Sequence, residues 1–360
     1  MNARRSSPDV DTLTSHIAST LRLDPPTIQI LRLGNNERGT AWHILFSAQG
    51  EKYFAKHIPT ESVPLAKPVA LPTDLNFAPT PESRRDAVAQ LQQEREATIA
   101  LGAISGGVST PTPEAISSPH RTMVWRAADG LQLEDFLRRS RRNKVMAGVG
   151  VKACHTLGQW LRKVHDSSTT EMRTLEPGGH VAALEKWADQ LGAQDRKYVA
   201  RAVRILEEAK SALPTPAEAP RCLIHGDLQY PNILLDEKTR DLTVVDFEWS
   251  GTGGAETDLV AFVANTRAKE LNPSYPAATA RLWEKAFWEG YGPIDTKLAH
   301  LVDALATAWI FYWYLPGLTR RQKFMSPARR TTVALFRSLV ENHQVNRFCA
   351  HHGIAGHTAD

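Results

Sequence analysis

The sequence predicts an α+β protein of two lobes: a small antiparallel β-sheet lobe with one helix, followed by a larger, mainly helical lobe. Three short strand patterns lie within residues 28–58, whereas helical patterns dominate from Leu131 onward. The length of 360 residues fits two compact units. We therefore expect one lobe over residues 1–126 and a second over residues 127–360.

The composition is that of an ordinary globular protein. Apolar residues make up 42% of the chain and charged residues 23%, which excludes collagen-like, low-complexity and wholly disordered classes. The formal net charge is only +4, and no dense basic block is present. We therefore expect no nucleic-acid partner.

Cysteine usage and apolar runs indicate a cytoplasmic protein without a membrane segment. The three cysteines, Cys154, Cys222 and Cys349, are far apart and form no CxxC pair, which fits a reducing compartment. Residues 1–21 lack the apolar core of a signal peptide. The longest apolar run, residues 301–318, contains an aspartate and ends near Pro-Gly, which favours a buried helix over a membrane span.

The first lobe is read from hydrophobic periodicity. Apolar residues at helical spacing predict an N-terminal helix over residues 10–21, which a Pro-Pro pair ends. Three strands of an antiparallel meander follow, at Ile28–Leu33, Thr40–Ala48 and Glu51–Ile58. Residues 59–81 contain six prolines and little periodicity, so we expect a long surface excursion there.

A helix is then expected from about Ser83 to Ala103, because Ser83 and Asp86 have capping-box spacing. Strands are expected near Glu114–Ile116 and Arg121–Arg126, before the junction of the two lobes at residues 127–130. In the second lobe, helices are expected at residues 133–139, 145–165, 180–191, 194–213, 256–268, 277–290, 296–314 and 328–342. Short strands around loops are expected at residues 222–248.

The residues that suggest a catalytic function are concentrated in residues 222–248. Asp227 and Asn232 lie five residues apart on a predicted loop, and Asp246 follows a second apolar strand. Phosphoryl transfer needs such a set: one carboxylate orients the attacking hydroxyl, while an amide and another carboxylate hold Mg²⁺. A lone aspartate is usually a turn former and His225 alone would be a core histidine. The joint spacing favours the functional interpretation.

The block H-G-D-x4-N followed by D-F-E resembles the catalytic and metal loops of the aminoglycoside phosphotransferase and choline kinase family. Members are small-molecule relatives of the protein kinases, which carry H-R-D-x4-N and D-F-G. Gly226 in place of Arg and Glu248 in place of Gly favour the small-molecule branch. The resemblance covers roughly residues 28–315 and implies a bilobal protein-kinase-like fold.

The resemblance also implies roles for residues of the catalytic block. Asp227 would be the catalytic base or the residue that orients the hydroxyl, and Asn232 and Asp246 would bind Mg²⁺. His225 would support the loop structurally, and Asp258 would hold the catalytic loop in place.

In the first lobe, the resemblance implies a lysine on the third strand paired with a glutamate on the following helix. Lys56 would reach the α- and β-phosphates, and Glu96 would pair with it, with Glu94 as the alternative. Only one of these glutamates can point at the lysine, because they lie on different helix faces.

Two further segments would complete the nucleotide-binding site. They are a phosphate-covering loop at Gly34–Gly39 and a hinge at Val124–Ala128. Backbone groups of Val124, Arg126 and Ala128 would hydrogen-bond the adenine. The implied cofactors are ATP, with GTP left open, and Mg²⁺.

The implied activity is transfer of the γ-phosphate to a hydroxyl of a small molecule: an aminoglycoside, another antibiotic, a sugar or an amino alcohol. Two alternatives remain, an atypical protein kinase and a non-catalytic, pseudokinase-like nucleotide-binding protein. Only about a dozen residues separate Asp246 from Asp258, too few for a peptide-docking activation loop. The oligomeric state is left open.

Aromatic residues in the C-terminal half allow two interpretations. Trp283, Phe287, Trp288, Tyr291 and residues 309–314 could form a cage for an ammonium group. Aromatics at helical spacing are more often core residues, and we favour that interpretation.

Overall fold

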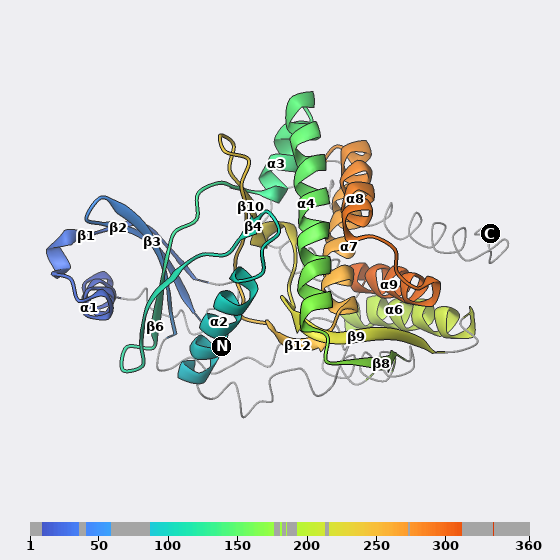
Figure 1. Cartoon of the computed structure of the whole chain (residues 1–360), viewed down its shortest axis with the longest axis horizontal. Coiled ribbons are helices and arrows are strands. Elements are labelled where there is room, and N and C mark those ends of the chain that lie inside the picture. The colour runs from blue at the N-terminus through green and yellow to red at the C-terminus, as the bar shows by residue number, and fades with distance from the viewer. Residues whose placement is uncertain are drawn as a thin grey trace.

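The computed structural model describes residues 9–35, 41–58, 87–175, 181, 185, 193–212, 216–272, 274–311 and 334. Within these ranges the chain forms a five-stranded sheet with two helices near the N-terminus and a helical region with two small sheets beyond it (Figure 1). The α+β prediction is thus confirmed. The proline-rich segment 59–81 and the helix expected at 328–342 lie outside the described residues, apart from residue 334 in the latter.

The five-stranded sheet has the order β1-β2-β3-β6-β5, and all its strand pairs are antiparallel. Strands β1, β2 and β3 form the predicted meander, and β6 then pairs with β3. Their bounds are β1 (Ile28–Asn35), β2 (Trp42–Ala48), β3 (Glu51–His57), β5 (Pro113–Ser117) and β6 (Thr122–Arg126).

Two helices cover opposite faces of this sheet. Helix α1 (Val10–Leu21) packs Leu13 and Ile17 against one face, in a cluster that includes Ala55 of β3. Helix α2 (Ala87–Gly102) packs Leu91 in a second cluster, which includes Phe54. Because successive side chains of a strand alternate between faces, Lys56 points to the α2 side, toward the helical region.

The helical region is built around two long helices in close contact, α4 (Lys144–Ser168) and α8 (Ala277–Tyr291) (Figure 1). The other helices are α3 (Leu133–Ser140), α6 (Ala193–Ala212), α7 (Glu256–Leu271) and α9 (Thr296–Trp309). These elements fall where the sequence predicts helices. The expected helix at 180–191 lies outside the described residues except at positions 181 and 185.

Two small sheets carry the loops of the catalytic block. One has the order β4-β11-β10-β7 and the other β12-β9-β8. Their strands are β4 (Val108–Ser109), β7 (Leu131–Gln132), β8 (Glu171–Leu175), β9 (Ala217–Ile224), β10 (Ile233–Leu235), β11 (Leu242–Val244) and β12 (Gly251–Gly254). Strands β4, β7, β8 and β12 were not expected from the sequence, because they are too short or too poor in apolar residues to show a strand period.

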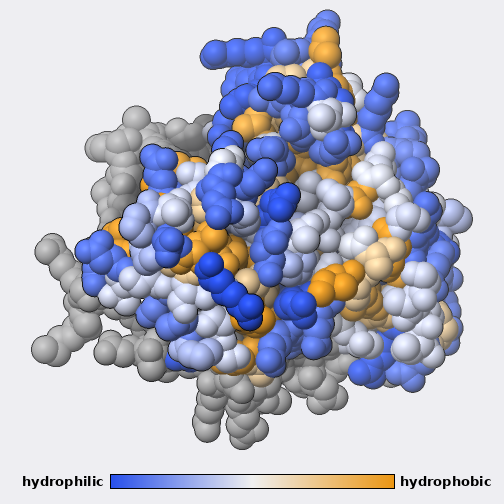
Figure 2. Space-filling model, turned by 60° about the vertical axis from the view of Figure 1, so that its left-hand side comes forward, coloured by the Kyte–Doolittle hydropathy of each residue, from blue (hydrophilic) through white to orange (hydrophobic). Residues whose placement is uncertain are grey.

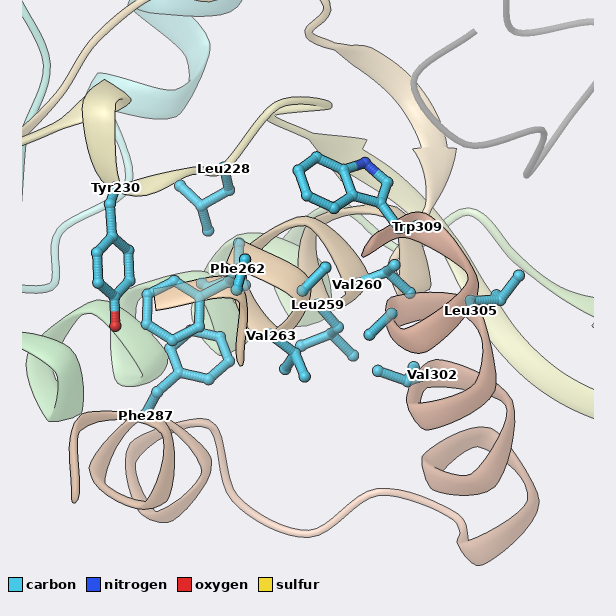
Figure 3. Packing of buried hydrophobic residues seen from close by; sticks show 14 of the residues in the cluster. Leu228, Tyr230, Leu259, Val260, Phe262, Val263, Phe287, Val302, Leu305 and Trp309 are labelled. Carbon is cyan, nitrogen blue, oxygen red and sulfur yellow. The ribbon is translucent and has the colours of Figure 1, made fainter. Parts of the chain in front are cut away.

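The core of the helical region extends beneath the catalytic block. Figure 3 shows Leu228 and Tyr230 of the block packed beside Phe262 of α7 and Phe287 of α8. The rings of Phe262 and Phe287 are stacked with centroids 4.0 Å apart. The loop of the catalytic block, which bears polar side chains, is therefore held in place by fully buried side chains of the core.

Of the aromatic residues considered for a cage, the described ones belong to the core or pack against it, as favoured by the sequence, and residues 312–314 lie outside the described residues. The fully or almost fully buried members are Trp283, Phe287, Tyr291, Trp309 and Phe311. The Trp283 indole N–H donates a hydrogen bond to the Ala147 carbonyl at 3.1 Å. These rings therefore do not form an open ammonium cage.

The described surface has no broad apolar face in the view of Figure 2, where hydrophobic residues occur in small groups among hydrophilic ones. Among the described residues, no helix combines the length and the apolar character that crossing a bilayer requires.

Helices α4 and α8 approach closely because glycines face each other. A Cβ placed at Gly158 would lie 2.2 Å from the Phe287 carbonyl oxygen, whereas one at Gly148 of the same helix would meet nothing within 4 Å. We expect Gly158→Ala to lower the free energy of unfolding by about 1–3 kcal/mol through overpacking. Gly148→Ala should raise it by up to about 1 kcal/mol, because alanine is the better helix former.

Urea denaturation of the two variants checks this prediction. Equal effects of the two substitutions would contradict the close helix contact.

Candidate active site

The catalytic block is held by one buried carboxylate at the start of α7. Asp258 is fully buried, and its two oxygens accept hydrogen bonds from the backbone N–H groups of His225, at 2.9 Å, and Gly226, at 2.8 Å. Charge-assisted hydrogen bonds to backbone amides are among the strong ones in proteins. The position predicted for Asp258, as support for the loop, agrees with these contacts.

Gly226 is required by the backbone at this point. Its φ is +79°, and a Cβ there would lie 2.2 Å from the Trp249 carbonyl oxygen. Positive φ and this close approach both disfavour any side chain. The loop therefore turns sharply at Gly226, directly before Asp227.

The His225 side chain is buried, and its hydrogen bonds hold the loop in place. Its Nδ1 accepts from the Asp227 backbone N–H at 3.2 Å, and its Nε2 donates to the Val245 carbonyl at 3.0 Å. The Ser250 hydroxyl donates to the His225 carbonyl at 2.9 Å. A proton on Nε2 and none on Nδ1 satisfies both bonds of the ring.

Asp227 and Asn232 are in direct contact. The Asn232 side-chain amide donates to the Asp227 backbone carbonyl at 2.9 Å and to its carboxylate Oδ2 at 3.2 Å. The other carboxylate oxygen, Oδ1, accepts from the side-chain amide of Gln229. Asp227 is half-buried, which leaves its carboxylate accessible to a small molecule.

Asp246 lies beside Asn232, because the Val245 backbone N–H donates to the Asn232 carbonyl at 2.9 Å. Asp246 has a φ of +66°, a left-handed conformation that is uncommon outside glycine and that clusters at functional sites. Both side chains line the same cavity.

A magnesium ion fits this pair. Mg²⁺ prefers oxygen ligands, and it is usually held by one or two protein carboxylates together with water and substrate phosphates. Asn232 donates its amide hydrogens to Asp227, so its carbonyl oxygen is the group left for a metal. No group of three or more His, Cys, Asp or Glu within the described ranges could hold a metal by itself.

Lys56 is buried among three carboxylates. Its Nζ lies 2.9 Å from Glu94, 3.1 Å from Glu248 and 3.7 Å from Asp246. Burial alone would lower the pKa of Lys56, but the three carboxylates outweigh it and raise that pKa well above its usual value. Burial raises the pKa of the Glu94 carboxyl, against the opposing effect of the Lys56 ammonium.

The prediction that Glu96 pairs with Lys56 is wrong, and the alternative, Glu94, is the partner. Glu94 is only 3% exposed, whereas the Glu96 side chain is exposed. Leu91, Glu94 and Leu101 share the buried face of α2 at helical spacing. Ile99, three residues after Glu96, is also exposed, so Glu96 lies on the solvent face of α2.

The hinge prediction is partly wrong. Arg126 and Ala128 line the cavity, but Val124 is fully buried within β6, where it is paired with Ala55 on one side and Ala115 on the other. The Ala127 backbone N–H donates to the Lys52 carbonyl at 3.0 Å. Residues 125–128 therefore form this edge of the cavity, so the segment begins one residue later than the predicted hinge at Val124–Ala128.

One cavity of about 280 Å³ joins these groups. Residues from the sheet, from α2 and from the catalytic block line it, among them Lys56, Glu94, Arg126, Ala128, Asn232 and Asp246. Asp227 itself is not a lining residue and adjoins the cavity through Asn232. Residues 36–39 of the expected phosphate-covering loop lie outside the described residues.

For Glu248 the sequence left open a role beside the metal ligands and a solvent-facing role, and for Gln229 it predicted no role. Glu248 contacts Lys56, and Gln229 contacts Asp227. Glu248 belongs to the D-F-E motif, and the departure of that motif from D-F-G could have indicated a role for Glu248 at the site. The sequence indicates no role for Gln229 beyond its position two residues after Asp227.

A buried lysine–glutamate pair, a carboxylate beside an amide and a second carboxylate around one cavity are the arrangement of a phosphoryl-transfer site in a protein-kinase-like fold. The sequence model described as the APH, or phosphotransferase enzyme, family matches residues 40–299. The chain therefore belongs to this phosphotransferase family and is an enzyme of the kinase type. No curated protein sequence matches it.

Solved structures share the fold at low sequence identity. Amicoumacin kinase hAmiN, solved with AMP-PNP, Ca²⁺ and Ami, has a TM-score of 0.56 and 13% identity, over 93% of this chain and 94% of that one. Aminoglycoside phosphotransferase APH(4)-Ia has a TM-score of 0.54 and 13% identity, over 92% of this chain and 99% of that one. A choline/ethanolamine kinase family protein from Mesorhizobium loti has a TM-score of 0.51 and 18% identity, over 95% of this chain and 100% of that one.

The two glutamates of α2 give a matched test of the site. Glu94→Gln removes a buried charge that holds Lys56, so we expect turnover of Mg²⁺-ATP to fall at least about tenfold, a change of about 1.4 kcal/mol in activation free energy. Glu96→Gln changes an exposed carboxylate and should leave turnover within about twofold. Steady-state ADP release by both variants is the measurement, and a larger loss in Glu96→Gln would contradict the pairing.

Proposed function

We propose that this enzyme transfers the γ-phosphate of ATP to a hydroxyl of a small molecule, with Asp227 as the catalytic base and Mg²⁺ held by Asn232 and Asp246. The observation that carries the proposal is the contact of Asp227 with Asn232 beside a cavity that Lys56 and Asp246 line. Catalysis of this kind depends mainly on positioning and charge neutralisation, and these residues provide both.

Each group has a distinct role in this proposal. Asp227 is held by two amides so that its carboxylate accepts the proton of the acceptor hydroxyl. Lys56, which is held by Glu94, would contact the phosphates of the nucleotide. A bound Mg²⁺ neutralises the charge that develops on the transferred group.

The surplus of negative charge at Lys56 supports the use of a cation. Even with Glu94 left out, because burial raises its pKa, the carboxylates of Asp246 and Glu248 outnumber the one ammonium of Lys56 before any nucleotide binds. A nucleotide adds further negative charge, and a divalent metal offsets it. The structural neighbour amicoumacin kinase, solved with AMP-PNP and Ca²⁺, supports the same use of a nucleotide and a divalent cation.

The adenine would lie against residues 125–128, at the edge of the five-stranded sheet. The backbone N–H groups of Arg126 and Ala127 already donate to the Thr112 and Lys52 carbonyls, so we assign the backbone N–H of Ala128 to the nucleotide. We place the boundary of the two lobes here, between residues 126 and 127, so that the cavity lies between them.

A small-molecule acceptor is favoured by the segment between Asp246 and Asp258. Its middle part, β12, is paired with β9 in an antiparallel ladder from Gly251 to Gly254. A segment that is short and fixed in a sheet leaves no loop on which a peptide substrate could dock. The amicoumacin, aminoglycoside and choline/ethanolamine kinase neighbours are consistent with this class of acceptor.

Asp227→Asn tests the assignment of the base. An amide cannot take the hydroxyl proton, so we expect phosphoryl transfer to fall by about 10²–10⁴-fold. ATP binding should be kept, because Asp227 does not line the nucleotide cavity. Acceptor-dependent ADP release from Mg²⁺-ATP is measured with a panel of aminoglycosides, other antibiotics, sugars and amino alcohols, and ATP binding by calorimetry. Retention of most activity would contradict the role of Asp227.

Asp246→Asn tests the metal site. The substitution removes one of two expected ligands, so we expect the Mg²⁺ concentration for half-maximal turnover to rise by at least about tenfold. Asp241→Asn, an exposed aspartate close by in sequence, is the control and should not change it. Turnover titrated with Mg²⁺ at fixed ATP is the measurement, and identical titrations for the two variants would exclude Asp246 as a ligand.

A further inference from the structure

His43 of β2 lines the cavity to which we assign the nucleotide, and the proposed function gives it no role. Its side chain is half-buried, and its ring lies 5.5 Å from that of Phe54, measured between centroids. No hydrogen bond connects its ring nitrogens to another residue in the described part of the chain. The imidazole is therefore available to a ligand in the cavity.

The strand register places His43 beside Lys56. These two residues are direct partners in the antiparallel pairing of β2 with β3. Direct partners point to the same face of a sheet, with Cβ atoms about 5 Å apart. Leu45 and Phe54 form the next pair on that face, and both pairs line the cavity. The cavity wall therefore consists of one apolar pair followed by one pair that can donate hydrogen bonds.

The two pairs lie at different ends of the cavity. Phe54 is paired with Trp125, which belongs to the segment assigned to the adenine. Lys56 is two residues further along β3 and lies 3.7 Å from Asp246, which we assign to the metal. A nucleotide with its base at the Phe54 end therefore extends toward Lys56, and its phosphates reach the end where His43 lies.

Lys56 by itself offers few donors to a polyphosphate. An ammonium has three N–H groups, and those of Lys56 donate to Glu94 at 2.9 Å and to Glu248 at 3.1 Å. One N–H group is then left for the phosphates, which carry several acceptor oxygens. A second donor beside Lys56 would bind oxygens that Lys56 does not reach.

A neutral His43 is sufficient for this purpose. Burial and the nearby Lys56 ammonium lower the pKa of His43, against the opposing effect of Asp246 and Glu248. A neutral imidazole keeps one N–H group that donates. The hydrogen bond therefore does not depend on a change in the protonation of His43.

We propose that His43 is a nucleotide-binding residue whose ring N–H donates to a phosphate oxygen beside Lys56. The ligand class is a nucleoside di- or triphosphate, and the base and ribose are not contacted by His43. This inference rests on the proposed use of a nucleotide in the cavity, but it does not depend on the acceptor or on Asp227.

The test compares the binding of three probes to the full chain: Mg²⁺-ATP, adenosine, which lacks phosphates, and Mg²⁺-tripolyphosphate, which lacks the base. His43→Leu removes the donor and keeps a side chain of similar size. We expect its Kd for Mg²⁺-ATP and for tripolyphosphate to rise about tenfold or more, because a hydrogen bond to a charged group is lost. The Kd for adenosine should change less than about twofold.

His43→Gln keeps an N–H donor and should restore most of the affinity for Mg²⁺-ATP. Calorimetry measures the binding of Mg²⁺-ATP, and competition with Mg²⁺-ATP measures that of the other two probes. Urea denaturation checks that each variant folds, and His43→Ala, which also removes the donor, replaces His43→Leu if the latter does not fold.

Leu45→Ala is the matched control. Leu45 lies on the same strand and the same face as His43, but it is paired with Phe54 at the adenine end of the cavity. Its truncation should weaken Mg²⁺-ATP and adenosine by the same factor, because an apolar contact with the base is lost. It should leave the affinity for tripolyphosphate unchanged, which is the opposite pattern to that of His43→Leu.

The outcomes separate this inference from the proposed function. An unchanged Kd for Mg²⁺-ATP in His43→Leu, or equal losses for Mg²⁺-ATP and adenosine, would overturn the role of His43 and leave the function intact. Equal losses in His43→Leu and His43→Gln would show that the shape of the ring matters rather than its donor, and would also overturn it. Absence of Mg²⁺-ATP binding to the unmodified protein would overturn the proposed function itself.

Discussion

The buried carboxylate of Asp258 is the interaction on which the site depends. It accepts the backbone N–H groups of His225 and Gly226, which would otherwise be buried without partners. His165 of α4 lies 3.3 Å from the same carboxylate, and its other ring nitrogen contacts the Tyr291 hydroxyl of α8 at 2.9 Å. Three helices are thus joined to the loop at one point, so the position of Asp227 follows from the packing of the core.

A second constraint is electrostatic and acts from the opposite side of the cavity. Lys56 comes from the sheet, Glu94 from α2, and Asp246 and Glu248 from the catalytic block. The Gln93 side chain also donates to the Ser250 carbonyl at 3.0 Å, so α2 contacts the block directly. These contacts couple the sheet to the catalytic block, and they hold the lysine at the cavity to which we assign the nucleotide.

The sequence was informative wherever a function depends on spacing within one segment. Asp227, Asn232 and Asp246 follow one another along two short strands, so their proximity could be read from the chain. The choice between Glu94 and Glu96 depends on which face of α2 is buried, and apolar residues do not mark that face alone, since Ile99 is exposed. The contact of Gln229 with Asn265 spans 36 residues and depends on how α7 packs, which no local pattern encodes. Strand β12 has the sequence Gly-Thr-Gly-Gly and forms only because β9 offers its edge.

The central claim is that the γ-phosphate moves to a hydroxyl of a small molecule, and phosphorus NMR follows that event directly. The protein would be incubated with Mg²⁺-ATP and each class of acceptor while the phosphorus signals are recorded. With one acceptor class, we expect the γ-phosphate signal to be replaced in equal amount by a phosphomonoester signal. Phosphate that appears only on an added basic protein, or only as inorganic phosphate with every acceptor, would contradict it.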